Sequence, residues 1–398
     1  MGHSALRENL ILGAMSGPSS TMVLLVPLYM GHLGYEVQLI GFILAITSAA
    51  TLAARFAVPR LYRPERSRIL LIVMLTVGGV TFGTLPYMPG LLTFVMVMVV
   101  NRAAYGIATT CFLARYLDAL SEGTNRRAAM GYFGGVQAAG YTTSNALVGL
   151  LADFISFEAA FLYGTVFSLF AVALLFGARA LPPRQLASTP AHPTGPRAWL
   201  REIRDPGLWG VLNGNFWNTV FHTVLISFFP VYAVGIGMGP AQVGLARAIY
   251  STVNAVARPI AGLVMGRFSL MHTTVGGLVV QAIILASVGF VDSFGVIAAL
   301  FLVGGTGRAV VLVANSAALA EDVDETHVSR GSATSTYTAT QDVAGISSPA
   351  AGGLMAGAIG TGGMFVAVGS ISLVAYLAGC AVVARWRAQV RNTRVKPF

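Results

Sequence analysis

Uninterrupted apolar stretches of roughly 20 residues recur along the whole chain, and they limit its possible folds more than any other feature. Each stretch is long enough for one helix to cross about 30 Å of hydrocarbon. Lipid offers no partners for backbone N–H and C=O groups, so a spanning segment must be a helix or part of a closed barrel. The sequence lacks the short alternating segments of a barrel. It therefore predicts an all-α membrane protein.

The composition agrees with this class. The 398-residue chain is 55% hydrophobic and only 10% charged, whereas a soluble domain carries about 25% charged residues. The formal net charge of +10 raises the question of a nucleic-acid partner. Basic runs interleaved with aromatic residues do not occur, so we expect no such partner. Cys111 and Cys380 both lie in apolar stretches, which argues against a disulfide framework.

The apolar pattern predicts twelve transmembrane helices. Their expected ranges are 9–31, 37–57, 69–88, 91–114, 129–151, 157–178, 207–233, 240–264, 272–291, 295–319, 331–357 and 363–385. Arginine and lysine cluster on one side of these spans, whereas the opposite loops, near 32–36, 89–90, 152–156, 234–239, 292–294 and 358–362, contain neither. By the positive-inside rule we expect both termini in the cytoplasm. We also expect the membrane to be a bacterial inner (plasma) membrane.

The two halves of the sequence repeat one another. With an offset of 203 residues, 26–55 aligns without a gap on 229–258. The shared residues are Pro27 with Pro230, Tyr29 with Tyr232, Gly34 with Gly237, Gly41 with Gly244, Ala45 with Ala248, Ile46 with Ile249, Ser48 with Ser251, Ala54 with Ala257 and Arg55 with Arg258. We therefore predict two six-helix bundles, 1–178 and 207–386, joined by a Pro- and Ser-rich cytoplasmic linker, 179–206, and followed by a basic tail, 387–398.

Short motifs support this plan. The span 91–114 contains Arg102, Gly106 and Ala108, which approximate an R-x-x-x-G-x-x-A pattern, and the loop 58–68 is rich in arginine. With these motifs, the sequence resembles the major facilitator superfamily over essentially the whole chain. The resemblance implies twelve helices in two pseudo-symmetric bundles and a function in solute transport.

A looser resemblance is to the drug–proton antiporter branch, which has a Gly- and Pro-rich motif in its fifth helix. The chain keeps Gly131, Gly140 and Gly149 of that motif but lacks the aspartate usual in the loop 58–68. Glycine allows close helix approach, and proline allows a bend. The residues expected to act in gating are Gly140, Gly149, Pro349, Gly352 and Gly353, with Arg55 and Arg258 at cytoplasmic helix ends.

Two arginines, Arg102 and its counterpart Arg308, lie near the middle of predicted spans. A charge there costs at least ~2.5–3.5 kcal/mol on insertion scales, so it should face protein or water. We expect both to bind an anionic or polar substrate group; the alternative is a structural role, with the guanidinium bonded to helix carbonyls. Arg247 lies nearer the outer surface, and we expect it to snorkel outward rather than face a cavity.

Asp342 and His222 are the candidate proton carriers. Asp342 lies about as deep in its span as Arg308 does, and a pair made and broken during transport would load and release a proton. A static ion pair is the equal alternative. His222 lies mid-span, where it would titrate near neutral pH; a neutral, hydrogen-bonded histidine is its alternative.

Amide and aromatic side chains mix in the span 207–233. The resemblance implies that this helix lines a cavity, so we expect it to contact a partly aromatic organic solute. Asparagines that bond across helices are the alternative. The candidate contacts are Asn213, Trp217 and Phe221, with Gln137 and Gln341 on equivalent turns of 129–151 and 331–357.

Enzyme motifs for hydrolysis, metal-dependent proteolysis or nucleotide binding do not occur in the sequence, so we expect no enzyme, cofactor or metal site. Transport would then draw on an ion gradient. We expect a monomeric, proton-coupled exporter of a small organic solute, working by alternating access, with lipid, protons and the solute as its partners. The first alternative is a proton-coupled importer of an organic anion clamped by Arg102 and Arg308. A receptor or scaffold that does not transport is more remote.

Overall fold

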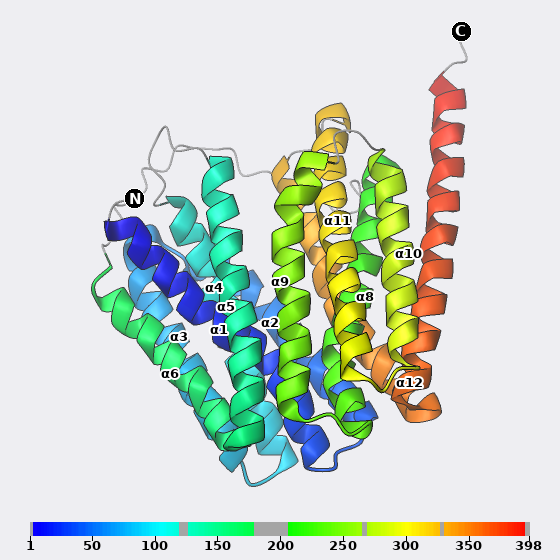
Figure 1. The fold of residues 1–398 in the computed structure, drawn as a ribbon. Helices are drawn as coiled ribbons and strands as arrows, with labels where there is room; N and C mark the ends of the chain where they lie inside the picture. The colour runs from blue at the N-terminus through cyan, green and yellow to red at the C-terminus, as the bar shows by residue number, and fades with distance from the viewer. Residues whose placement is uncertain (1–2, 119–125, 179–205, 265–268, 327–329, 395–398) are drawn as a thin grey trace. The chain divides into compact units, whose positions relative to one another are not determined.

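The computed structural model describes residues 3–118, 126–178, 206–264, 269–326 and 330–394, and this part of the chain is helical, without a β-strand (Figure 1). The predicted linker lies outside it apart from residue 206. The helices are α1 (His3–His32), α2 (Val37–Leu61), η1 (Pro64–Arg66), α3 (Ser67–Thr84), η2 (Leu85–Tyr87), α4 (Leu91–Asp118), α5 (Arg126–Phe154), α6 (Phe157–Phe176), α8 (Pro206–Gly235), α9 (Pro240–Val264), α10 (Leu270–Val288), α11 (Phe294–Thr326) and α12 (Arg330–Arg394), of which η1 and η2 are short 3-10 helices.

The all-α class is confirmed, and each of the twelve predicted ranges coincides with a helix or with one arm of a helix. Ten spans coincide with α1 to α6 and α8 to α11, and the last two are the two arms of α12. The arms meet at Gly360, whose backbone angles of φ 76° and ψ 162° break the helix inside the loop expected at 358–362. Residues with a side chain rarely adopt a positive φ, so glycine suits this break.

Within the described residues, nine helical stretches are long and apolar enough to cross a membrane, and one of them, Thr336–Trp386, contains both arms of α12. The predicted spans missing from these nine are α5 and α9. Each carries several polar side chains, among them Asn145 on α5 and Arg247 on α9. A helix of this kind is stable in a membrane where its polar face meets protein or water.

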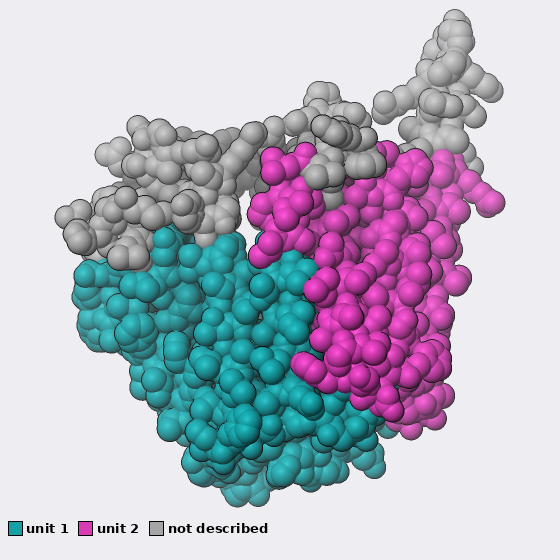
Figure 2. Space-filling view, viewed as in Figure 1, with its two compact units in different colours: residues 1–186, 226–255 teal, residues 187–225, 256–398 magenta. Residues whose placement is uncertain are grey.

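The chain forms two compact units (Figure 2). Unit 1 comprises residues 1–186 and 226–255, and unit 2 comprises residues 187–225 and 256–398. Unit 1 therefore contains α1 to α6, the end of α8 and most of α9, while unit 2 contains the start of α8, the end of α9, and α10 to α12. The predicted division into bundles at the linker stays a prediction.

Close helix contacts build both units. In unit 1, α1 packs against α5 and α6, α2 packs against α4, and α3 lies between α4 and α6, beside α6 in Figure 1. A Cβ added to Gly79 on α3 would lie 2.9 Å from Cβ of Ser168 on α6. In unit 2, α10 packs against α11 and α12. A Cβ on Gly277 of α10 would lie 2.5 Å from a methyl group of Val311 on α11.

A buried ion pair ties α1 to α4 in unit 1. Nη2 of Arg115 lies 2.9 Å from Oε1 of Glu8, and Nη1 donates a hydrogen bond of 3.2 Å to Oγ of Ser67 on α3. The Arg115 side chain is 1% exposed and that of Glu8 is 14% exposed. Three helices therefore meet at one guanidinium that lies at the end of a predicted span, where a charged residue needs no special explanation.

The internal repeat recurs as two turns with the same hydrogen bonds, one after α1 and one after α8. In each turn a glycine N–H bonds to the carbonyl three residues back, and the next N–H bonds to the carbonyl five residues back, over 2.9–3.0 Å. The two glycines are Gly34, with φ 79°, and Gly237, with φ 87°. The repeat that the sequence shows therefore has a structural basis in these turns.

We expect Gly34→Ala and Gly237→Ala to lower the free energy of unfolding by similar amounts, about 1–2 kcal/mol each, because an L-residue pays this cost in the left-handed region. A Cβ at either position meets no atom within 4 Å, so backbone strain is the whole effect. Thermal unfolding in detergent measures it. Gly31→Ala, also in open space but inside α1, is the control and should not destabilise the protein. A loss at only one of the two glycines would contradict the equivalence of the turns.

Candidate functional site

Polar side chains from three helices meet inside unit 2. Oδ1 of Asn218, on α8, accepts a hydrogen bond of 3.1 Å from Nε2 of Gln281 on α10. Nη1 of Arg308, on α11, donates to the backbone carbonyl of Asn218 over 3.4 Å. Asn218 is fully buried and Gln281 is 5% exposed. We name Asn218, Gln281 and Arg308 the donor cluster, because each presents N–H groups.

The donor cluster has spare hydrogen-bonding capacity. Within the described part of the chain, Nδ2 of Asn218 has no acceptor. A buried donor left without an acceptor costs roughly 1–3 kcal/mol, which a ligand oxygen in its place would recover. Carboxylate, phosphate and carbonyl oxygens are suitable acceptors, and a permanently charged guanidinium favours the anionic ones. The cluster can therefore bind an anionic or oxygen-rich group.

A second set of amides joins α8 to the first arm of α12. Nε2 of Gln341 donates to Oδ1 of Asn215 over 3.0 Å, and Nδ2 of Asn215 donates to the carbonyl of Tyr337 over 2.8 Å. Gln341 and its neighbour Asp342 are both half-buried, as is His222 on α8. Gln341, a predicted solute contact on α12, thus bonds to Asn215 of α8, three residues before Asn218 of the donor cluster. The pairing of Asp342 with Arg308 stays a prediction.

Asn213 and Trp217 are occupied by contacts within unit 2. Nδ2 of Asn213 donates to the carbonyl of Tyr376 on α12 over 3.1 Å, and Nε1 of Trp217 donates to Oδ1 of Asn213 over 3.1 Å. These bonds favour the structural alternative, in which an asparagine ties two helices together. Phe221 is 2% exposed and lies in the interior of the protein.

In unit 1, α5 and α9 approach one another closely. A Cβ on Gly149 would lie 2.8 Å from Cα of Gly244, and a Cβ on Gly244 would lie 2.5 Å from the carbonyl oxygen of Asn145. Nδ2 of Asn145 donates to Oγ of Ser251 over 3.4 Å, and its Oδ1 accepts from Oγ of Ser20, on α1, over 3.3 Å. We name Asn145, Gly149, Gly244 and Ser251 the α5–α9 seam. The close helix approach expected at Gly149 is present, while its part in gating stays a prediction.

Arg247 lies beside this seam, and the expectation that it snorkels is wrong. Its side chain is 5% exposed, whereas a snorkelling side chain would reach the protein surface. Among the residues that the structure describes, none accepts a hydrogen bond from its Nη1. The sequence gives the position of Arg247 along α9 but not the direction of its side chain around the helix. It therefore does not show which neighbour the side chain faces.

Arg102 is half-buried on α4. Arg55 of α2 and Tyr141 of α5 lie close enough to act on its charge. Two guanidinium groups in proximity repel one another, and an anion near both would relieve the repulsion. Gln137 is half-buried one turn before Tyr141. Gly140, between them, brings α5 against α1, where an added Cβ would lie 2.7 Å from a backbone carbonyl oxygen.

The other predicted gating residues differ in exposure. Arg258 is exposed on α9, in unit 2. Three others are buried in the first arm of α12, namely Pro349, Gly352 and Gly353. One functional candidate was not predicted at all, Gln281, because an isolated amide in an apolar span has no distinguishing pattern.

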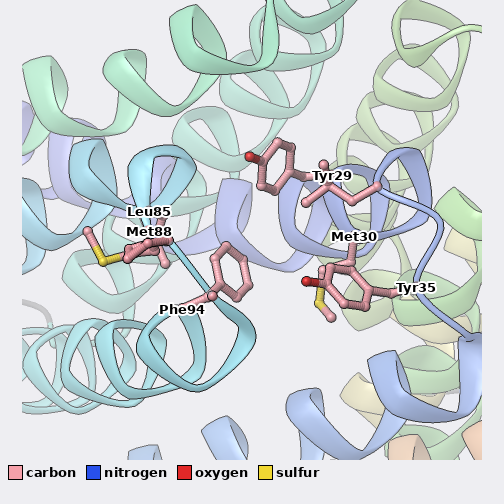
Figure 3. A pocket seen from close by; sticks show the side chains of 9 residues that line it. Tyr29, Met30, Tyr35, Leu85, Met88 and Phe94 are labelled. Atoms are coloured by element: carbon pink, nitrogen blue, oxygen red, sulfur yellow. The ribbon is translucent and has the colours of Figure 1, made fainter.

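Unit 1 also contains a small aromatic pocket (Figure 3). Tyr29, Tyr35 and Phe94 line it together with Met30 and Met88. Its volume is about 110 Å³, well below the roughly 300–1,000 Å³ of pockets that hold organic ligands. The pocket is too small for such a solute, so the polar clusters remain the better candidates.

Comparison with known proteins gives one family and a set of related folds. The model of the Major Facilitator Superfamily matches residues 10–328 and 214–398. The search of curated protein sequences finds no match. A solved structure of a bacterial homologue of the human lysosomal transporter Spinster, inward-facing and occupied, has a TM-score of 0.75 at 14% identity, over 96% of each chain.

Two further solved structures have the same fold. The nucleoside transporter NupG, in a mutant form, has a TM-score of 0.75 at 14% identity, over 95% of this chain and 99% of its own. A POT family transporter in complex with a thioalcohol-conjugated peptide has a TM-score of 0.74 at 11% identity, over 96% of each chain. At such low identity these likenesses concern the fold alone.

Proposed function

Since this chain belongs to the major facilitator superfamily, we propose that it is a secondary transporter for a small organic solute that carries an anionic or oxygen-rich group. The observation that carries the proposal is the buried Nδ2 of Asn218, which lacks an acceptor in the described part of the chain and lies beside Arg308. Solutes of the classes named for the similar structures, nucleosides and peptides, present oxygens of the kind required.

Each unit contributes a guanidinium to this function. Arg308 acts with Asn218 and Gln281 in unit 2, and Arg102 acts beside Arg55 in unit 1. A guanidinium binds a carboxylate or phosphate through two parallel hydrogen bonds, which fixes orientation as well as charge. Each guanidinium would be reached from one side of the membrane at a time, as alternating access requires.

Asp342 carries the coupled proton in this proposal. Its neighbour Gln341 is bonded to Asn215 of α8, three residues from Asn218 on the same helix. Protonation of Asp342 removes a negative charge from this part of the protein and so changes the attraction for a bound anion. We propose export as the direction of transport. The second candidate is import of an organic anion, which is supported by the surplus of interior arginines.

Binding tests the proposal first. We expect benzoate, inorganic phosphate, a nucleoside or a dipeptide to raise the Tm of the purified protein, and choline to leave it unchanged. Arg308→Gln should raise the apparent Kd of the best probe at least ~10-fold, since a charge-assisted hydrogen bond contributes roughly 1.5–3 kcal/mol. Arg385→Gln, which removes an exposed arginine on α12, is the control and should bind normally. Stabilisation by choline alone, kept in Arg308→Gln, would contradict the anionic or oxygen-rich solute.

Direction needs proteoliposomes and the best-binding probe. With a proton gradient imposed, an exporter moves the probe against the proton flow, and a symporter moves it with the flow. Asp342→Asn should abolish the dependence on the gradient while it leaves probe binding in place. A protein that binds a probe but never moves it would support the receptor or scaffold instead.

A further inference from the structure

We infer that Arg247 is a second anion-binding position, which holds the carboxylate or phosphate group of the transported solute from α9. The inference rests on the proposed function, since it names the part of the solute that a group in unit 1 recognises. It concerns a residue that the sequence analysis expected to snorkel outward rather than face a cavity.

Burial is the first observation. Arg247 is 5% exposed, and Nη1 has no acceptor among the described residues. Arginine stays protonated in proteins, so it cannot avoid the cost of burial by losing its charge. A lipid headgroup is a poor partner, because a side chain in contact with lipid would be exposed at the protein surface. The missing partner is therefore an anion that enters from within the protein.

The internal repeat supplies the second observation. The residue of the first half that corresponds to Arg247 is Leu44, which is 7% exposed. The two halves thus bury the same position almost equally, and an apolar side chain is sufficient there in the first half. The fold does not require a charge at this position, so the charge in the second half serves binding.

The surroundings of Arg247 fit the same role. On α9, Gly244, Arg247 and Ser251 are spaced three and four residues apart, which puts them on the same face of the helix. Arg247 follows Pro240, the first residue of α9, by seven residues, which at 1.5 Å per residue is a depth of about 10 Å. Tyr250, which is 4% exposed, lies close enough to act on the charge. Ser251 and Asn145 add a hydroxyl and an amide from the seam.

The α5–α9 seam offers a route to this position. Two side-chain hydrogen bonds join α5 to α9 here, from Asn145 to Ser251 over 3.4 Å and from Thr252 to Thr142 over 3.2 Å, and the closest contacts join glycine backbones. We infer that the two helices separate along this seam during transport. An anion then reaches Arg247 when the seam opens, and the guanidinium is buried again when the seam closes.

The repeat also provides the test, because Arg247→Leu installs the residue of the first half. The purified protein is titrated with benzoate and with inorganic phosphate at constant ionic strength, and Tm is measured. We expect at least one of these anions to stabilise the wild type, with an apparent Kd at least ~10-fold weaker in Arg247→Leu and intermediate in Arg247→Lys. Arg385→Gln is the matched control and should respond as the wild type does.

Stability without anion separates a binding role from a structural one. Arg247→Leu should then have a Tm equal to or above that of the wild type. A lower Tm, or a protein that does not fold, would make Arg247 structural and overturn the inference. Stabilisation by phosphatidylglycerol but by neither soluble anion would assign the position to a lipid headgroup and also overturn it.

Failure here is distinguishable from failure of the proposed function. If Arg247→Leu keeps full anion binding while Arg308→Gln loses it, the inference fails and the proposed function stands. If neither anion stabilises the wild type, the Arg247 inference fails, and flux of the nucleoside or dipeptide probes decides the proposed function.

Discussion

Gly244→Val is expected to reduce transport at least ~10-fold in a protein that still folds. A Cβ there would lie 2.5 Å from the carbonyl oxygen of Asn145 and 2.8 Å from Cα of Gly149. Backbone atoms cannot move aside as a flexible side chain can, so α5 and α9 must separate. Overpacking of this kind costs about 1–3 kcal/mol, which shifts the equilibrium between a closed and an open seam by roughly 5- to 150-fold.

Flux of the best-binding probe in proteoliposomes measures the loss of transport. The state of the seam is measured separately, with Thr142→Cys and Thr252→Cys, because the two hydroxyl oxygens lie 3.2 Å apart. In a background without Cys111 and Cys380, oxidation should cross-link this pair more slowly in Gly244→Val, and Gly149→Val should behave in the same way. Gly262→Val is the control on α9, because a Cβ there meets no atom within 4 Å. Normal flux in Gly244→Val would show that the cycle does not need the closed seam.

The sequence predicts the helices of this protein well because their cause is local. Twenty apolar residues in lipid must form a helix whatever surrounds them, since their backbone groups have no other partners. The break at Gly360 and the matching turns at Gly34 and Gly237 are also local, because they depend on glycine at a positive φ. These features need no knowledge of which helices are neighbours.

The candidate site is predicted less well, because it depends on neighbours. Arg308 was chosen for its depth and its place in the repeat, and Gln341 for its place in the repeat. Their partners Asn218 and Asn215 lie on a helix about 90 or more residues away in the chain. Asn213 was predicted to contact the solute but bonds to Tyr376 of α12. Arg247 was expected to snorkel rather than face a cavity because depth along a helix is visible in a sequence, whereas the direction of a side chain around the helix is not.

Arg115 should respond to substitution in the opposite way to Arg247. We expect Arg115→Met to lower the free energy of unfolding by about 3–5 kcal/mol, because it leaves the Glu8 carboxylate buried without its partner. Glu8→Leu should cost a similar amount by stranding the guanidinium. The double variant should cost less than either single one, since paired apolar side chains often replace a buried ion pair with little loss. Denaturant unfolding in detergent, arranged as a double-mutant cycle, measures the coupling.

Two arginines with almost equal burial, 1% and 5% exposed, thus have different expected effects for one reason. The charge of Arg115 is met by a carboxylate at 2.9 Å and a hydroxyl at 3.2 Å, so the folded state depends on it. The Nη1 atom of Arg247 has no acceptor in the described part of the chain, so removal of Arg247 relieves the folded state and should abolish anion binding instead. If the free-energy losses of Arg115→Met and Glu8→Leu simply add in the double variant, Glu8 and Arg115 are not coupled. The ion pair would then not explain why Arg115 and Arg247 differ, and this would contradict the distinction.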